Sequence, residues 1–228
     1  MKLKNPFSEL TRFEWILWIS SVCVAVVSYI FSGAGGLFEM LSAVLGVTAL
    51  IFVAKGLVIG QALTVVFGLM YAYTSIECKY YGEAITYLFM AAPIALMATI
   101  EWIKHPYKDT DVVEVSRADK KQISIMCLLA CLVTIILYFA LKFFGTANLL
   151  FSTISVTTSF IAAYLTYLRS PYYGLGYAAN DIVLIVLWVL MSIEDLSYLP
   201  MIACFVMFLA NDLYGFFNWK RLSKLQNT

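Results

Sequence analysis

The chain has 228 residues, of which 62% are hydrophobic and 13% are charged, and its formal net charge is +1. A soluble domain has about 45–50% apolar and about 25% charged residues, so this composition excludes a water-soluble protein, and the charge suggests no nucleic-acid partner. A membrane-crossing helix needs about 20 apolar residues, so the length allows seven or eight spans and no separate soluble domain.

Apolar runs predict eight helical spans in one integral membrane domain, an all-α membrane protein. The first run follows Lys2, Lys4 and Arg12, as in a signal peptide, but 15–31 is long for one and seven more runs follow. We therefore interpret it as a retained span. The expected spans are 14–32, 36–54, 57–77, 83–103, 122–143, 148–168, 172–191 and 198–217.

Lysine and arginine predict the orientation. With eight spans, 13 of these residues fall on the side of both termini, and only Lys79 and Lys142 fall on the other. Because positive charge accumulates in cytoplasmic loops, both termini are expected in the cytoplasm. Tryptophans near span ends are expected to be anchors at the membrane interface. These are Trp15, Trp18, Trp102 and Trp219.

The second half of the chain repeats features of the first, which is common in transporters. At an offset of 117 residues, Ser75-Ile76-Glu77 matches Ser192-Ile193-Glu194, Trp102 matches Trp219, and Tyr71 matches Trp188. Shorter offsets relate Lys55 and Gly60 to Arg169 and Gly174, and Thr48 to Thr157.

This repeat predicts two parallel triple-helix bundles, 36–103 and 148–217, joined by a linker span at 122–143. The span at 14–32 is then additional, giving a 1+3+1+3 arrangement of eight transmembrane helices. A substrate is expected between the bundles, near the midplane.

Polar residues inside spans are costly and indicate functional positions. The expected substrate-binding residues combine amides, acids and aromatic rings, which can stack on a flat ring and bond its polar edge. Alternatively, Asn180 and Asp181 bond to other helices and only hold the bundle together. Glu14, Glu39, Glu83 and Glu101 lie near span ends and are expected to reach headgroups or water, or to be structural. The expected site consists of Gln61, Tyr71, Tyr173, Tyr177, Asn180, Asp181, Trp188 and Asn211.

The residues of catalysis and metal binding are missing. The single histidine, His105, lies in a loop beside Pro106, and the five cysteines form no metal-binding pattern. Cys127 and Cys131 are one helical turn apart and are expected to face lipid or pack. We therefore expect no enzyme, no metal and no cofactor. Pro93 is expected to kink the fourth span.

Several motifs together resemble the PnuC family of bacterial nicotinamide riboside transporters, which have a SWEET-like fold. The resemblance covers about residues 45–222. The motifs are Ala54-Lys55-Gly56, Tyr71, Tyr81-Gly82-Glu83, Glu101-Trp102, Asp181 and Tyr214-Gly215-Phe216-Phe217-Asn218-Trp219.

The resemblance implies uptake of nicotinamide riboside by facilitated diffusion across a bacterial inner membrane, with trapping by cytoplasmic phosphorylation. Tyr173 and Tyr177 stand where the family often has tryptophan. Related branches carry thiamine or riboflavin, and a membrane scaffold or sensor is a further alternative. The expected partners are thus a vitamin-like substrate and the lipid bilayer, and a homo-oligomer is allowed.

Overall fold

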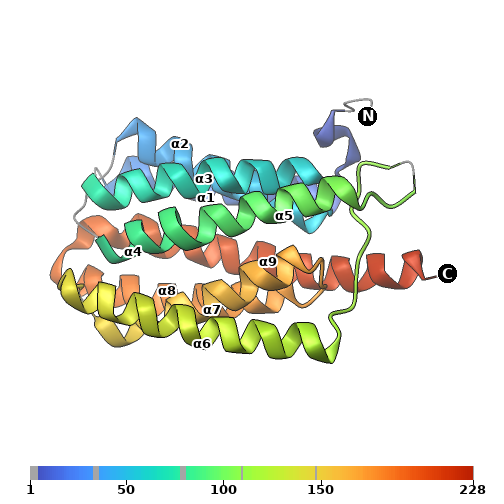
Figure 1. Cartoon of the computed structure of the whole chain (residues 1–228). Helices are drawn as coiled ribbons and strands as arrows, with labels where there is room; N and C mark the ends of the chain where they lie inside the picture. Colours follow the sequence, from blue (N-terminus) through green and yellow to red (C-terminus); the bar gives the residue numbers. More distant parts are fainter. Residues whose placement is uncertain (1–4, 33–35, 78–80, 109, 147, 228) are drawn as a thin grey trace.

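The computed structural model describes residues 5–32, 36–77, 81–108, 110–146 and 148–227. In Figure 1 the long helices run side by side, and both termini lie at the same end of the molecule, called here the termini end. Eight spans are long and apolar enough to cross a membrane, which confirms the predicted number. The last one continues to Gln226, beyond the expected boundary at 217.

The described spans are formed by helices that fit the predicted segments closely. Short 3-10 helices, η1 (Pro6–Glu9) and η3 (Leu196–Tyr198), precede the first and last of them. The helices are α1 (Arg12–Ser32), α2 (Leu37–Ala54), α3 (Val58–Glu77), α4 (Tyr81–Thr86) with η2 (Tyr87–Ala91) and α5 (Ala92–Lys104), α6 (Lys120–Phe143), α7 (Leu149–Tyr167), α8 (Tyr173–Glu194) and α9 (Leu199–Gln226).

Local sequence explains where two of these helices begin. Asp119 and Gln122 exchange side-chain and backbone hydrogen bonds of 2.7 and 3.0 Å at the start of α6. Thr11 and Glu14 do the same before α1, at 3.3 and 2.6 Å. Such capping boxes satisfy amide groups that have no partner within the helix.

The fourth span is interrupted where a kink was predicted. It passes from α4 into the single π-helical turn η2, and α5 resumes with Pro93 in its first turn. Proline has no N–H and cannot continue the regular hydrogen-bond ladder, so the preceding turn widens. The wide turn carries Tyr87.

Contacts between helices follow the predicted repeat. The first helix of each predicted bundle packs against the last helix of the other, since α2 contacts α9 and α7 contacts α5. Helix α1 contacts the first helix of one predicted bundle, α2, and the last helix of the other, α9. Helix α6 likewise contacts α7, the first helix of one bundle, and α4 in the last span of the other. The additional span α1 is therefore placed like the linker span α6, which is consistent with a 1+3+1+3 division.

Repeated residues make corresponding contacts. Trp18 on α1 donates to Thr48 on α2 at 3.0 Å, and Thr134 on α6 bonds Thr157 on α7 at 2.8 Å. Thr48 and Thr157 are a matched pair in the sequence repeat. The repeat thus corresponds to real packing positions.

Trp102 and Trp219 hold the two bundles together at the termini end. The Trp102 indole donates to the Thr166 carbonyl of the other bundle at 3.0 Å, and the Trp219 indole donates to the Val53 carbonyl at 2.9 Å. The two rings lie 5.2 Å apart, and both are 0% exposed. Their prediction as interfacial anchors is therefore wrong, because they lie between the bundles rather than at the lipid surface.

Replacing Trp102 or Trp219 with phenylalanine is expected to remove one cross-bundle hydrogen bond and part of the buried packing of the larger indole ring. Each change should lower the free energy of unfolding by about 1–3 kcal/mol, which thermal unfolding in detergent measures. Trp15→Phe is the control, because its indole makes no hydrogen bond to a described residue. Equal stability losses in all three variants would contradict the assignment.

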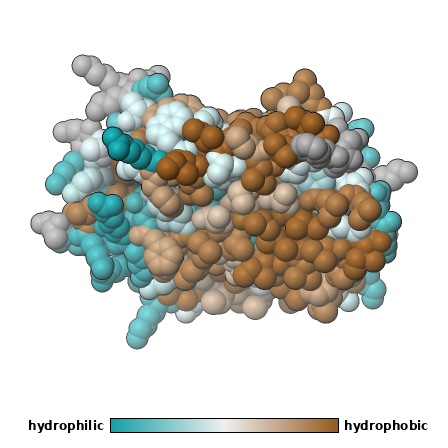
Figure 2. Space-filling view, turned by 180° about the vertical axis from the view of Figure 1, so that it is seen from behind, coloured by the Kyte–Doolittle hydropathy of each residue, from teal (hydrophilic) through white to brown (hydrophobic). Residues whose placement is uncertain are grey.

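The surface has the pattern of a membrane protein. In Figure 2 apolar side chains cover much of the middle of the molecule, and polar ones gather mainly over the termini end. Large apolar side chains are exposed along the spans, for example Phe143 at 84% and Phe89 at 71%. Lipid chains would cover these side chains.

Candidate substrate-binding site

A cavity of about 70 Å³ lies among α2, α3, η2, α7, α8 and α9, and thus between the two predicted bundles. Its wall combines aromatic rings with amides and acids. The lining residues are Gly46, Ala49, Leu50, Val53, Gln61, Thr64, Phe67, Gly68, Tyr87, Ala91, Ser159, Tyr173, Tyr177, Asn180, Asp181, Phe205, Phe208 and Asp212.

Helix α8 supplies several of the polar lining residues. Tyr173, Tyr177, Asn180 and Asp181 fall on neighbouring faces of that helix and all line the cavity. The Asn180 carbonyl oxygen accepts hydrogen bonds from Ser155 at 3.2 Å and Thr158 at 2.9 Å on α7. These bonds fix the amide, and its nitrogen makes no hydrogen bond to a described residue. A donor therefore remains for a ligand.

Two acids face each other across α8 and α9. The carboxyl groups of Asp181 and Asp212 are close enough to interact directly, and both residues are about 97% buried. One oxygen of Asp181 has no hydrogen-bond partner among the described residues. Two ionised carboxylates this close repel each other in a low-dielectric interior, so the pair is suited to a proton or a bound cation.

Glycine 174 brings the helices that carry these acids together. A Cβ at this position would lie 2.5 Å from the Asp212 carbonyl oxygen and 2.8 Å from the Phe216 nitrogen. Both are backbone atoms, which cannot move aside without moving α9. The absence of a side chain at Gly174 therefore sets the α8–α9 distance at the acid pair.

No lysine, arginine or histidine is among the described residues that line the cavity. The lining also includes the rings of Phe67, Tyr87, Phe205 and Phe208, and aromatic rings attract cations through their faces. Gln61, 3% exposed, adds an amide without a hydrogen bond to a described residue. Chemically, this cavity can hold a flat cationic ring that carries a few hydrogen-bonding groups.

Aromatic side chains enclose the cavity at both ends. Towards the termini end the Tyr173 ring packs at 4.8 Å on the Trp219 ring. Towards the opposite end Tyr71 and Tyr87 pack at 4.4 Å, with Phe67 beside them. Pockets for drug-sized ligands are typically about 300–1,000 Å³, so a ligand needs these rings to move.

Five of the eight predicted site residues line the cavity: Gln61, Tyr173, Tyr177, Asn180 and Asp181. Three do not. Tyr71 belongs to the aromatic layer beside the cavity, and Trp188 lines a different pocket. Asn211 instead donates to Ser21 on α1 at 3.0 Å.

Two of the four acids near span ends, Glu14 and Glu83, are buried and do not reach headgroups or water, and the contacts of Glu14 fit the structural alternative. Glu14 is 1% exposed, pairs with Lys55 at 3.3 Å and accepts a 2.5 Å hydrogen bond from Tyr214. Glu83 is 8% exposed. Neighbouring helices cover both side chains. Among the described residues, no group of three or more histidine, cysteine, aspartate or glutamate side chains could hold a metal ion.

Eight apolar spans around an enclosed polar and aromatic cavity define an α-helical membrane protein of the small-molecule carrier type. The crystal structure described as the vitamin B3 transporter PnuC has this fold: it superposes with a TM-score of 0.81 over 95% of this chain and 94% of that chain, at 24% identity.

The sequence profile of the nicotinamide mononucleotide transporter family matches residues 36–221, and the chain belongs to this family. A similar relative is the nicotinamide riboside transporter PnuC of Neisseria mucosa, 25% identical over 97% of this chain and 86% of the relative. The resemblance to the PnuC family expected from the sequence motifs is thus confirmed, and the chain is a multi-pass membrane protein of a transporter family.

Proposed function

We propose that this protein carries nicotinamide riboside into a bacterial cell across the inner membrane, with both termini in the cytoplasm. The observation that carries the proposal is the acid pair Asp181–Asp212 in an aromatic cavity. Nicotinamide riboside is a pyridinium cation with ribose hydroxyls and a carboxamide. The acids balance the ring charge, the aromatic faces stack on it, and Asn180 and Gln61 bond its polar groups.

The same cavity argues for the riboside over its 5′-phosphate. A phosphate monoester brings about two negative charges into a site that already contains two acids and, among its described lining residues, no basic side chain. Like charges at close range in a poorly solvated site disfavour binding by several kcal/mol. The family is named for the mononucleotide and the Neisseria mucosa relative for the riboside, and the charge of this cavity favours the latter.

The proposed mechanism is facilitated diffusion with trapping by phosphorylation. No nucleotide-binding loop is visible in the sequence, and the cavity offers no described acid–histidine relay. A carrier of this kind equilibrates the riboside, and its phosphorylation in the cytoplasm would then prevent its return, because the product fits the cavity poorly.

Uptake of labelled riboside into proteoliposomes tests the proposal. Uptake should saturate, stop at equal concentrations inside and outside, and exceed equilibrium only when a riboside kinase and ATP are enclosed. Labelled mononucleotide should not enter. Saturable uptake of thiamine or riboflavin in place of the riboside would move the protein to a related substrate, and accumulation without kinase would contradict facilitated diffusion.

A further inference from the structure

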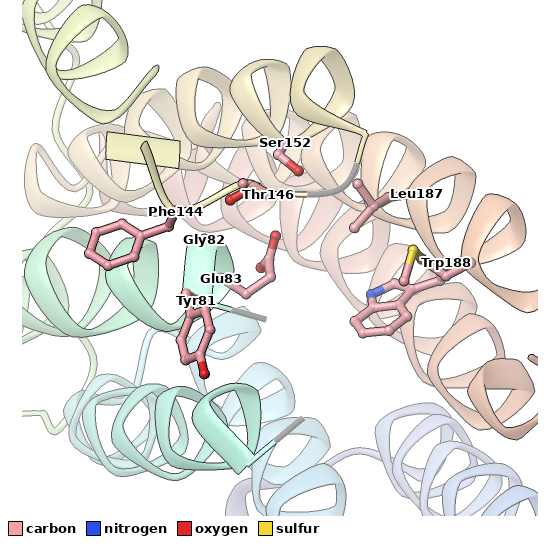
Figure 3. A pocket seen from close by; sticks show the side chains of 10 residues that line it. Tyr81, Gly82, Glu83, Phe144, Thr146, Ser152, Leu187 and Trp188 are labelled. Atoms are coloured by element: carbon pink, nitrogen blue, oxygen red, sulfur yellow. The ribbon is translucent and has the colours of Figure 1, made fainter. Parts of the chain in front are cut away.

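A second pocket, of about 140 Å³, lies at the end of the molecule opposite the termini. It is formed by the start of α4, the turn after α6, and α7 and α8 (Figure 3). It shares no lining residue with the central cavity. Its lining consists of Tyr81, Gly82, Glu83, Phe144, Gly145, Thr146, Ser152, Leu187, Trp188 and Met191.

Glu83 is the unusual member of this pocket. Only 8% of its surface is exposed. Its carboxylate makes no hydrogen bond or ion pair with any residue the structure describes. In Figure 3 the carboxylate points into the pocket, between Thr146 and Trp188. The buried Thr146 hydroxyl likewise has no partner among the described residues. A buried acid without a partner is costly, and a cation in the pocket would offset that cost.

Glu14, the other buried glutamate considered above, has several partners for its carboxylate. Glu14 is as deeply buried, but it has Lys55 at 3.3 Å, the Tyr214 hydroxyl at 2.5 Å and the Thr11 amide at 2.6 Å. Glu83 has only the favourable field of a helix start, since it lies in the first turn of α4. Among the described residues, Glu83 therefore has no counterpart of the Lys55 cation that pairs with Glu14.

The wall of this pocket resembles that of the central cavity. Trp188, Tyr81 and Phe144 supply aromatic rings around one acid, and none of the described lining residues is basic. Trp188 lies seven residues after Asp181 on α8, about 10 Å further along the helix. Glu83 lies one turn before Tyr87, whose ring lines the central cavity. The rings of Phe67, Tyr71 and Tyr87 lie on the side of the central cavity that faces this end of the molecule.

We infer that this pocket is a second binding site for a flat aromatic cation, with Glu83 as its counter-ion and Trp188 as a ring surface. A pyridinium ring arriving from this end would bind here before it passes the aromatic layer to Asp181 and Asp212. This inference deepens the proposed function and rests on it for the identity of the natural ligand. The site itself is defined by the chemistry of Glu83 and the rings.

The direct test disables the central site and asks whether a cation still binds. Purified protein carrying Asp181→Asn is compared with the same protein carrying Glu83→Gln as well, using labelled 1-methylnicotinamide as a pyridinium probe in equilibrium dialysis. The added Glu83→Gln change should weaken binding of the probe about tenfold or more. Neutral nicotinamide should bind both proteins equally weakly, because it lacks the charge that Glu83 attracts.

Glu194→Gln is the matched control, because it removes one exposed acid at the same end and outside the pocket. An equal loss of probe binding with Glu194→Gln would overturn the site and indicate a general surface charge effect. Should Glu83→Gln not fold, Thr146→Phe in the Asp181→Asn background fills the pocket from the turn and should abolish the same binding.

Transport separates this inference from the proposed function. In proteoliposomes with otherwise wild-type protein, Glu83→Gln should raise the KM for riboside about tenfold while the maximal rate stays within about threefold. If wild-type protein takes up the riboside but probe binding does not depend on Glu83, the second site is overturned and the proposed function stands. Probe binding that depends on Glu83, in a protein that does not carry the riboside, would support the cation site and overturn the proposed function.

Discussion

Replacing Asp181 with asparagine is expected to weaken riboside binding about 100-fold and to stop measurable uptake. Asparagine keeps the shape of the side chain but removes a charge that faces the cationic ring in a poorly solvated cavity. Loss of one partner of a buried charge pair typically costs about 2–5 kcal/mol in binding. Isothermal titration and proteoliposome uptake measure the two effects. Asp212→Asn should behave in the same way.

These variants should bind the riboside less tightly without losing stability. Asp181 and Asp212 face each other without a described basic partner, so neutralising one acid relieves repulsion. The apparent melting temperature in the absence of ligand should be unchanged or higher. A large fall in melting temperature would show that the acids hold the helices together, as in the alternative considered from the sequence.

Asn211→Ala provides the matched control next to Asp212. Asn211 bonds Ser21 at 3.0 Å and does not line the cavity. This change should lower stability, by about 1–3 kcal/mol, and leave the dissociation constant for the riboside unchanged. Reversed results for Asn211 and Asp181 would contradict the placement of the site.

Gly60→Ala and Gly174→Ala are expected to abolish or severely reduce folded protein. At Gly60 a Cβ would lie 2.4 Å from the Val53 nitrogen of α2, and at Gly174 it would lie 2.5 Å from the Asp212 carbonyl of α9. Overpacking against rigid backbone should cost at least about 3 kcal/mol. The yield of monodisperse protein and its melting temperature are the measurements.

Gly68→Ala on the same helix as Gly60 is the control. Its Cβ would meet the Ala92 Cβ at 3.4 Å, which is an ordinary contact. Its effect on stability should stay within about 1 kcal/mol. Equal losses at Gly60 and Gly68 would show that α3 needs glycine for another reason than close packing. Gly60 and Gly174 are matched positions of the sequence repeat, although their contacts differ: Gly60 meets α2, whereas Gly174 meets α9.

Much of the fold was predictable because membrane spans leave a strong record in hydropathy. Long apolar runs and the distribution of lysine and arginine predicted eight spans, and the structure has them. The repeat predicted corresponding positions, and Thr48 and Thr157 make corresponding contacts. The orientation of the termini and the division into bundles stay predictions.

The tryptophans show what hydropathy cannot resolve. Trp102 and Trp219 lie near the ends of apolar runs, as interfacial residues do, but the structure packs them between the bundles. Hydropathy alone does not distinguish a tryptophan facing headgroups from one facing another helix. Their matched positions in the repeat were the only signal, because residues near an internal axis of symmetry meet their counterparts.

The site was predictable where a polar residue lies inside an apolar run, as Gln61, Asn180 and Asp181 do. The prediction placed Asn211 in the site, whereas its neighbour Asp212 lines the cavity, because one residue turns a helix by about 100°. Trp188 shares a helix with Asp181 but lies two turns further along, in the second pocket. Phe67, Tyr87, Phe205 and Phe208 were missed, since aromatic residues in spans also face lipid.

An acidic, aromatic cavity should select a cationic riboside and reject its phosphate. This selectivity can be measured by isothermal titration of purified wild-type protein with nicotinamide riboside and nicotinamide mononucleotide. Binding of the riboside should saturate, and the mononucleotide should bind at least about 100-fold more weakly. Equal or tighter binding of the mononucleotide would contradict it, because the phosphate would then have found a basic site that the described cavity lacks.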